Sequence, residues 1–442
     1  MKKWLQPIDN APLVLFRIFF GILLAAETFG SIATGWVKRM LIEPKVHFSY
    51  IGFEWLTPLP GYGMYVYYTV MGILGLLVMI GYKYRWSLGI FTLLWTGSYL
   101  MQKASYNNHY YLLILICIIM LFLPANKYAS IDARNNPKIK ELSMPQWCSW
   151  VMIAQMAILY FFATLAKFYP DWLDGTFTQL LFSRLHRFPL IGSIFTEHWF
   201  HIFIAYAGIF FDGLIIPALL WKRTRTIALF AAFFFHLFNS ITLQIGIFPY
   251  FALSFVLFFY PPEQIRQVFF RNKPALNNNT LTTYVANKWV TSFFIIYFII
   301  QLVLPIRHYF IKGDVLWTEE GHKMSWRMML RERSGYTQFK VVDKATQTEL
   351  AYEWTKDLTR KQINMINSKP DAIWQMAQHI KKEFQTQNKE VSVYASTMVA
   401  INNKSMKPFT DATVDLAQMP WDYFWHCNWI LLYDSNGQLI SN

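Results

Sequence analysis

The sequence predicts an α-helical polytopic membrane bundle of about nine transmembrane helices, followed by an extracytoplasmic α+β domain. Of its 442 residues, 55% are hydrophobic and only 15% are charged, which is more apolar than a soluble fold requires. Apolar windows recur along residues 1–306, most of them close to the roughly 20 residues that a helix needs to cross a bilayer. From Arg307 the charges become dense and mixed, and no further window is long enough to span. We therefore expect a membrane domain over residues 1–306 and an extracytoplasmic domain over residues 307–442.

Nine apolar windows define the predicted membrane domain. The third is short, and the turn between the seventh and eighth is the least distinct. The windows cover residues 11–34, 64–81, 86–101, 109–124, 147–166, 199–221, 226–243, 246–261 and 288–306. The first window contains Arg17 and Glu27 and lacks a small-residue cleavage site, so we expect a retained span and not a removed signal peptide.

Basic residues are divided unevenly between the connections. Alternate connections carry 15 Lys and Arg on one side and 7 on the other. The richer set is Lys2, Lys3, Lys83, Arg85, Lys127, Arg134, Lys138, Lys140, Lys222, Arg223, Arg225, Arg266, Arg271, Lys273 and Lys288; the poorer is Lys38, Arg39, Lys45, Lys103, Lys167, Arg184 and Arg187. Because Lys and Arg concentrate in cytoplasmic connections, the N-terminus is expected inside and residues 307–442 outside. The net charge of +14 then reflects membrane topology, with the lipid bilayer as partner and no nucleic acid.

The C-terminal region mixes strand and helix patterns. Alternating or β-branched residues favour strands over Gln338–Val342, Glu349–Glu353 and Val391–Ile401. The stretch Pro370–Phe384 begins with a proline suited to a helix start, and its apolar residues recur on one helical face. This combination predicts an α+β domain.

Familiar soluble-enzyme motifs do not explain the chain. The three cysteines, Cys117, Cys148 and Cys427, imply no disulfide framework. His198 and His201 are three residues apart, but no Cys or carboxylate pattern accompanies them, so no metal is expected. The sequence has no Gly-rich phosphate loop and no GxSxG element.

Ionisable residues at the ends of apolar windows are the candidate functional groups. His109 opens the fourth window, Lys167 closes the fifth, and His236 lies in the outer half of the seventh, so the topology brings all three to one depth. The amides expected beside them are Asn107, Asn108 and Asn239. Each residue alone has an ordinary explanation: a histidine capped by a neighbouring asparagine, a lysine reaching the headgroups, or a core histidine. Together they favour a polar pocket open to the outside, because buried polar groups need partners.

Five sequence blocks carry a resemblance to a known family. They are SYNNHYYL, YFFATLAKFYPDWLDG, FFHLFNSITLQIGIFPYF, GDVLWTEEGHKMSWRMMLRER and MVAINNKSMKPFTDATVDLA, and they extend over nearly the whole chain. In this order and spacing they resemble the vitamin K-dependent gamma-glutamyl carboxylases and their bacterial relatives in the HTTM membrane family.

The resemblance implies roles for particular residues. Lys167 matches the family's catalytic base, and His109 matches the histidine of its Asn-Asn-His block. The positions expected to bind the cofactor are Asn107, Asn108, His236, Asn239, Trp326 and Met328. His109 and Asn108 would donate hydrogen bonds to the quinol or to its oxyanion.

The implied activity couples two reactions. Oxygenation of a reduced naphthoquinone (reduced vitamin K, or a menaquinol) to its epoxide would drive carboxylation of peptide glutamate, with O2 and CO2 as co-substrates. Two alternatives stay open, namely a quinol epoxidase without protein carboxylation and a non-catalytic lipid-binding membrane protein. The resemblance also implies an integral protein of the bacterial inner membrane and a Glu-containing peptide partner. Animal members have a second lysine where this chain has Ala166, a longer outer region and a cysteine bridge without counterpart here, so propeptide-guided, processive carboxylation is not part of the expectation.

Overall fold

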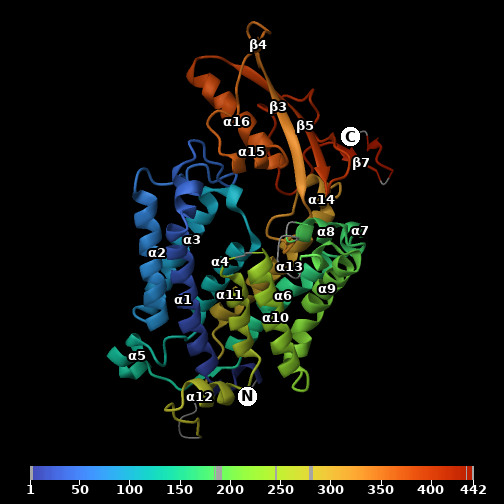
Figure 1. The fold of residues 1–442 in the computed structure, drawn as a ribbon. Coiled ribbons are helices and arrows are strands. Elements are labelled where there is room, and N and C mark those ends of the chain that lie inside the picture. Colours follow the sequence, from blue (N-terminus) through green and yellow to red (C-terminus); the bar gives the residue numbers. More distant parts are fainter. Residues whose placement is uncertain are drawn as a thin grey trace.

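The computed structural model describes residues 3–183, 185, 192–243, 246–277, 282–434 and 436–440. Three basic residues used above to predict sidedness, Lys2, Arg184 and Arg187, lie outside these ranges. The described chain forms a helical bundle with a smaller α+β region stacked on one end (Figure 1).

All nine apolar windows are helical. The helices are α1 (Ala11–Ala33), α2 (Gly63–Ile80), α3 (Tyr84–Met101), α4 (Asn108–Phe122), α6 (Trp147–Leu165), α9 (His198–Leu220), α10 (Arg225–Leu243), α11 (Phe248–Ser254) continued by η7 (Phe255–Phe258), and α13 (Lys288–Ile306). Among the described residues, six helices are long and apolar enough to cross a membrane: α1, α2, α6, α9, α10 and the run from Lys288 to Phe310. Helix α4 and the stretch Phe248–Phe258 are shorter apolar helices, and α3 includes Arg85 and several hydroxyl side chains. The chain is therefore a membrane protein, but the number of crossings is not fixed at nine.

Close backbone contact holds α1 against α2. A Cβ atom built on Gly21 would lie 2.3 Å from the backbone nitrogen of Met79, and one on Gly75 would lie 2.7 Å from that of Ala25. Only glycine therefore fits at either position. Small residues at a helix crossing let the two backbones approach, which is how membrane helices gain packing energy where lipid removes the hydrophobic driving force.

Short elements close the two ends of the bundle. They are η1 (Lys3–Leu5), β1 (Pro7–Asp9), η2 (Lys38–Ile42), η3 (Lys103–Ser105), α5 (Ile131–Asn135), η4 (Pro137–Ile139), β2 (Ser143–Pro145), α7 (Pro170–Leu173), α8 (Thr176–Phe182), η6 (Ile194–Thr196), α12 (Pro262–Phe269), η9 (Arg307–Phe310) and α14 (Val315–Thr318). The chain start, α5 and α12 lie at the end opposite the C-terminal region (Figure 1).

The C-terminal region is built on one antiparallel sheet of order β4-β3-β5-β6. Its elements are β3 (Arg333–Asp343), β4 (Glu349–Leu350), α15 (Arg360–Ile366), α16 (Pro370–Thr386), β5 (Val391–Ile401), β6 (Lys407–Pro408), β7 (Leu432–Tyr433) and β8 (Leu439–Ile440). Strands β3 and β5 pair along their full length, from Arg333 opposite Ile401 to Asp343 opposite Val391. The strand predicted over Glu349–Glu353 shrinks to β4, because only its first two residues pair with β3.

Helix α16 both covers the sheet and docks the region on the bundle. Its predicted apolar face is buried in one core with the sheet, and Phe48, from the α1–α2 connection, belongs to the same core. At its start, Asp371 pairs with the buried Lys103 at 2.8 Å and also with Lys323. Gln375 donates to the backbone oxygen of Ser49 at 3.0 Å. The α+β region is thus packed directly on the outer connections of the bundle.

Candidate functional site

A cavity of about 400 Å³ lies where the bundle meets the C-terminal region. Its walls come from the start of α4, the end of α6, and from α8, α9, α10 and α11. Its roof comes from His322, Arg327, Met328, Met329 and Lys369. Seven of the eight residues singled out from the sequence line it: Asn107, Asn108, His109, Lys167, His236, Asn239 and Met328. Its volume is in the range of natural small-molecule sites, about 300–1,000 Å³.

Lys167 is turned into this cavity. It follows the last turn of α6 by two residues, and its side chain is 10% exposed. The ammonium donates to the backbone oxygen of Ala163 at 3.1 Å and forms an ion pair with Asp212 of α9. It also lies 5.3 Å from the ring centre of Trp172. A lysine that reached for the headgroups would instead extend its amine towards water.

Asp212 is the functional candidate that the sequence reading missed. It is the one acidic residue of α9 beyond its N-cap, its side chain is 9% exposed, and it lines the cavity beside Lys167. A single carboxylate in an apolar span was itself a signal, since ionisable residues at such positions need a partner. The pairing could not be read from the sequence because the two residues are 45 positions apart.

The two histidines meet around one aromatic ring. His109 stacks on Phe248 of α11 with ring centres 3.7 Å apart and planes 14° apart. His236 meets the same ring edge-on, with centres 6.1 Å apart. His236 Nε2 lies 3.2 Å from the hydroxyl oxygen of Tyr160, whereas its buried Nδ1 has no hydrogen-bond partner among the described residues. His236 lines the cavity, and a buried ring nitrogen without a partner is suited to a polar group of a ligand.

The neighbouring amides Asn107 and Asn108 have different surroundings. Asn107 is the N-cap of α4, and its side chain accepts from the backbone N–H of Tyr110 at 2.7 Å. Asn108 accepts from the Tyr106 hydroxyl at 2.9 Å and donates to the backbone oxygen of Arg327 at 3.4 Å. Asn108 therefore ties the wall of the cavity to its roof, while Asn107 explains why a helix starts here.

Trp326 does not reach the cavity. Its side chain is fully buried and packs against Tyr111 with ring centres 5.2 Å apart. Its backbone has φ +58°, and its side chain is not part of the cavity lining, whereas its neighbours Arg327 and Met328 are. The structure thus supports packing for Trp326 and not the direct ligand contact expected from the sequence.

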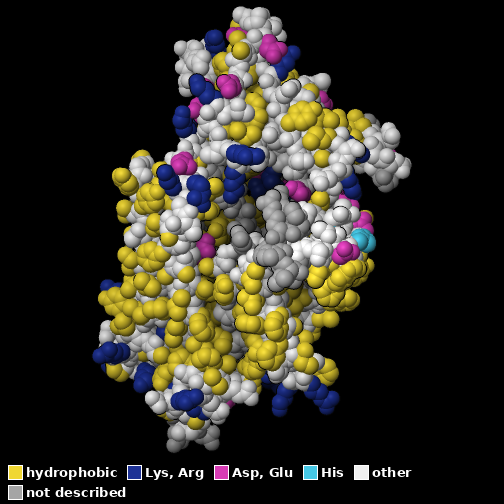
Figure 2. All heavy atoms as spheres, viewed as in Figure 1, with side chains coloured by type: hydrophobic (Ala, Val, Ile, Leu, Met, Phe, Trp, Pro, Cys, Tyr) yellow, Lys and Arg dark blue, Asp and Glu magenta, His cyan; other side chains and the backbone are white. Residues whose placement is uncertain are grey.

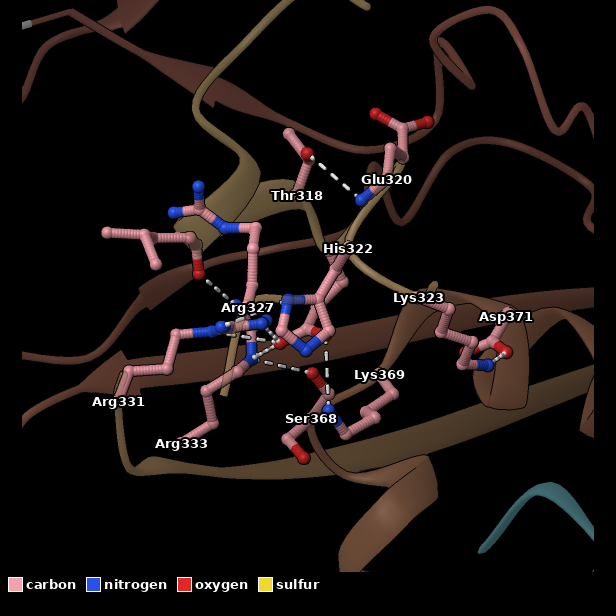
Figure 3. A network of polar contacts seen from close by, with 12 residues as sticks. Thr318, Glu320, His322, Lys323, Arg327, Arg331, Arg333, Ser368, Lys369 and Asp371 are labelled. Atoms are coloured by element: carbon pink, nitrogen blue, oxygen red, sulfur yellow. Dashed lines mark hydrogen bonds and ion pairs between the residues drawn. The ribbon is translucent and has the colours of Figure 1, made fainter. Parts of the chain in front are cut away.

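The roof of the cavity is a basic cluster (Figure 3). Side chains of Arg331, Arg333 and Lys369 converge around His322 and share one carboxylate, Glu319. Burial raises the pKa of Glu319, but the charges of Arg331 and Lys369 outweigh it and hold that pKa well below its ordinary value. Burial, reinforced by Arg331, holds the pKa of His322 well below its ordinary value, so its ring is neutral at neutral pH. The cluster therefore keeps an excess of positive charge.

Arg327 stands between two cavities. It is 9% exposed and forms no ion pair with a described carboxylate; Nη1 lies 3.5 Å from His308 Nε2, and Nε has no partner. It lines the 400 Å³ cavity and also a second one of about 710 Å³, which opens beside Asp171 and Lys404 under the C-terminal sheet. A desolvated guanidinium without a counter-ion is suited to a carboxylate that enters from either side.

Histidine, cysteine and carboxylate side chains are the groups that could ligate a metal. Among the described residues, no group of three or more His, Cys, Asp or Glu side chains could hold an ion. His201 instead lies with Nε2 2.9 Å from the backbone oxygen of Phe195, and the three cysteines are free and buried.

Fold and site together define a class of protein: an integral membrane protein with a non-cytoplasmic α+β domain, whose mainly apolar pocket holds a buried Lys–Asp pair under a basic roof. Two family models match the chain. The HTTM domain matches residues 5–263, and the lumenal domain of vitamin K-dependent gamma-carboxylase matches residues 286–436. The chain belongs to this carboxylase family, which confirms the resemblance seen in the sequence. No solved structure matches it.

Family membership indicates an enzyme of the carboxylase type with vitamin K as cofactor. The pocket fits such a group on its own evidence. Its wall offers flat aromatic surface at Phe248, and the unpartnered Nδ1 of His236 and the Lys167 ammonium provide polar atoms at separate points of its lining. A flat ring system with oxygen substituents matches this arrangement of apolar wall and few polar groups.

Proposed function

We propose that the protein is a vitamin K-dependent gamma-glutamyl carboxylase that couples oxygenation of a reduced naphthoquinone to carboxylation of peptide glutamate. The observation that carries this proposal is the single cavity lined by Lys167, His109 and His236 together. When bound, the quinol would supply the free energy of its oxidation by O2, which generates a base far stronger than any side chain. The chain's own part is to bind, to orient and to move the first proton.

The Lys167–Asp212 pair is the proposed proton acceptor. As ammonium and carboxylate the pair is neutral overall, and it stays neutral when one proton shifts from Nζ to the Asp212 carboxylate. The proposal places that proton on Asp212, so that Lys167 is a free amine. Lys167 Nζ can then accept a proton from a hydroxyl in the cavity, and the resulting ammonium is stabilised by the carbonyl of Ala163 and the ring of Trp172.

The histidines and amides are proposed to hold the quinol. His236 Nδ1 offers an unused hydrogen-bonding position, while Nε2 is oriented by Tyr160. Asn108 is already fixed by Tyr106 and by the roof, so its contribution costs little ordering entropy. His109, stacked on Phe248, and Asn239 complete the lining on that side.

The glutamate side chain is proposed to approach from the C-terminal region. The outer cavity leads to Arg327, which also faces the cavity of Lys167. A guanidinium binds a carboxylate through two parallel hydrogen bonds and would hold its γ-carbon near the quinol. The excess positive charge of the basic cluster at the roof suits an acidic substrate. It therefore favours the carboxylase over an epoxidase, which has no acidic substrate.

For the membrane arrangement we propose nine crossings, with the N-terminus in the cytoplasm and a bacterial inner membrane as location. The chain start and the C-terminal region lie at opposite ends of the bundle, which requires an odd number of crossings. Residues 1–306 would form the membrane domain and 307–442 the extracytoplasmic one. Cysteines introduced near Lys138 and near Lys389 should react with a membrane-impermeant reagent from opposite sides; reaction from the same side would exclude this topology.

One assay separates the possible activities. The purified protein is incubated with reduced vitamin K, O2, labelled bicarbonate and a Glu-containing peptide, and epoxide and fixed label are measured separately. A carboxylase yields both products. Epoxide without fixed label would indicate a quinol epoxidase, and binding of vitamin K without either product would indicate a non-catalytic lipid-binding protein.

A further inference from the structure

A third cavity lies at the end of the bundle opposite the C-terminal region. It has a volume of about 1040 Å³ and is enclosed by α1, the end of α2, residues 128–134, and the end of α12 with the turn after it. Five of its lining residues are basic and none is acidic: Arg17, Arg134, Lys140, Arg271 and Lys273. Lys and Arg side chains are prominent at this end of the molecule in Figure 2. Neither the carboxylase chemistry nor the pocket of Lys167 involves this cavity.

Arg17 forms the buried floor of the cavity. It is 0% exposed, although it lies within the first two turns of an apolar membrane helix. Its guanidinium donates to the backbone oxygens of Ala125 at 3.1 Å, Tyr128 at 3.4 Å and Ala129 at 2.6 Å, and Nε has no partner among the described residues. These partners are neutral dipoles and leave its full positive charge in place. A charge at such a depth is costly without an anion beside it.

The surrounding backbone is shaped for this guanidinium. Gly81 has φ +65°, and a Cβ atom there would lie 2.7 Å from Arg17 Nη1 and 2.5 Å from the Cβ of Ser130. Any other residue would therefore push Arg17 or the 128–134 segment out of place. The position of Arg17 is thus built into the fold.

The carboxylates near the cavity have partners within the fold, and the negative charge of Asp132 also acts on Arg17. Asp9 pairs with both Lys273 and Arg266. Asp132 accepts from the backbone N–H groups of Lys83 and Tyr84, at 2.7 and 3.0 Å, and from the Asn126 amide.

The three remaining cations of the cavity, Arg134, Lys140 and Arg271, are exposed and form no ion pair with a described carboxylate. The ammonium of Lys140 lies 5.8 Å from the centre of the Tyr128 ring. An anion in the cavity would therefore meet positive charge on several sides.

The rim of the cavity is apolar on the membrane side. Val268 and Phe269, at the end of α12, are 61% and 51% exposed, and Ile18, Met79 and Ile80 continue this wall along α1 and α2. A ligand that matches both parts carries a phosphate at one end and acyl chains at the other. Basic pockets between membrane helices are known to hold such headgroups.

We propose that this cavity is a binding site for an anionic phospholipid, with the headgroup phosphate among the exposed cations Arg134, Lys140 and Arg271, above the buried Arg17, and the acyl chains along the Val268–Phe269 wall. The lipid supplies negative charge to the three exposed cations, which have no ion pair with a described carboxylate. This site is independent of the proposed carboxylase activity.

The test uses the full-length protein in detergent, titrated with phosphatidylglycerol or phosphatidylcholine and followed by native mass spectrometry. The variant Arg134→Gln/Lys140→Gln/Arg271→Gln removes three exposed cations of the cavity. Its matched control, Lys222→Gln/Arg223→Gln/Lys288→Gln, removes three exposed cations from the same end of the bundle but outside the cavity. The first variant should bind phosphatidylglycerol about a hundredfold more weakly and the control should bind like the parent.

Three results would overturn the proposal. They are equal binding of the two lipids by the parent protein, equal loss of binding in the two variants, and displacement of the lipid by millimolar inorganic phosphate, which would identify a free anion as the ligand. If the triple variant melts early, the single change Arg271→Gln, at an exposed turn position, must give the same order of affinities.

Discussion

Two buried Lys–Asp pairs in this protein have nearly the same chemistry and very different surroundings. Lys103 and Asp371 join the bundle to α16, with side chains 1% and 12% exposed. Lys167 and Asp212 join α6 to α9, with side chains 10% and 9% exposed. The first pair is enclosed by protein. Lys103 also donates to the backbone oxygen of Asp371 at 3.0 Å, and Lys323 forms a second ion pair with the Asp371 carboxylate. The second pair faces a cavity that can hold a ligand.

This difference teaches that burial of a lysine does not by itself indicate catalysis. A buried ion pair is poor evidence even for stability, because desolvation offsets most of the attraction. What distinguishes Lys167 is access to an enclosed space, since a base must reach the proton it removes. Substitutions in the two pairs should therefore have different effects: on activity at Lys167 and on stability at Asp371.

The largest effect is expected for Lys167→Arg, paired with Lys103→Arg as control. Arginine keeps a cation on a long stem, so both variants should fold and insert. Guanidinium stays protonated in proteins and cannot accept a proton. Lys167→Arg should therefore lower epoxide formation by roughly 10²–10⁴-fold, while Lys103→Arg retains activity per folded molecule. Epoxide formation by Lys167→Arg near the parent rate would show that Lys167 only needs to be a cation.

Breaking the closed pair should act on stability instead. Asp371→Asn leaves Lys103 buried without its counter-charge, which costs about 3–5 kcal/mol of unfolding free energy. Thermal and denaturant unfolding in detergent measure this loss, and activity per folded molecule should change little. An equal loss from Lys45→Ala, which breaks the exposed pair with Asp357, would contradict the role of burial.

The same pair predicts the acid side of the stability profile. Burial raises the pKa of Asp371, but Lys103 and Lys323 outweigh it and hold the pKa well below its ordinary value. A carboxyl with a folded-state pKa below its unfolded value, about 3.9, contributes stability above that pH and loses it as the pH falls towards the folded pKa. Unfolding free energy should therefore drop below about pH 4 in the parent and drop less in Asp371→Asn.

The sequence predicted the elements better than their contacts. Nine helical windows and the α16 face were readable because apolar periodicity and window length are local properties. The Lys167–Asp212 pair and the roof of Arg327, His322 and Lys369 were not, because they join segments far apart in the chain. The motif also did not show that Trp326 packs against Tyr111 outside the cavity lining, because this packing depends on a residue far away in the sequence.

A moderate effect is expected for Arg327→Gln, which removes the unpaired guanidinium between the two cavities. Loss of a charged hydrogen bond to a carboxylate should raise the KM for the glutamate peptide about ten- to a hundredfold. Lys404→Gln is the control, because Lys404 lines the outer cavity but is already paired with Asp171 at 2.6 Å. If both changes raise KM equally, the outer cavity attracts the peptide only through its general charge.

A smaller effect is expected for His236→Leu, and it tests whether that ring is a core residue or a ligand contact. The ring packs edge-on against Phe211, Phe235 and Phe248, so a leucine of similar volume can fill its place. What leucine cannot supply is the free Nδ1. Activity should therefore fall about tenfold, which corresponds to the free energy of one hydrogen bond, with little change in melting temperature.

Tyr160→Phe removes only the partner of His236 Nε2 and serves as the matched variant. If the hydroxyl merely orients the ring, its loss should lower activity less than His236→Leu does. A His236→Leu protein that melts early yet turns over normally per folded molecule would instead make His236 a packing residue. The unpartnered Nδ1 would then need a bound water to satisfy it, because a buried ring nitrogen without a partner is costly.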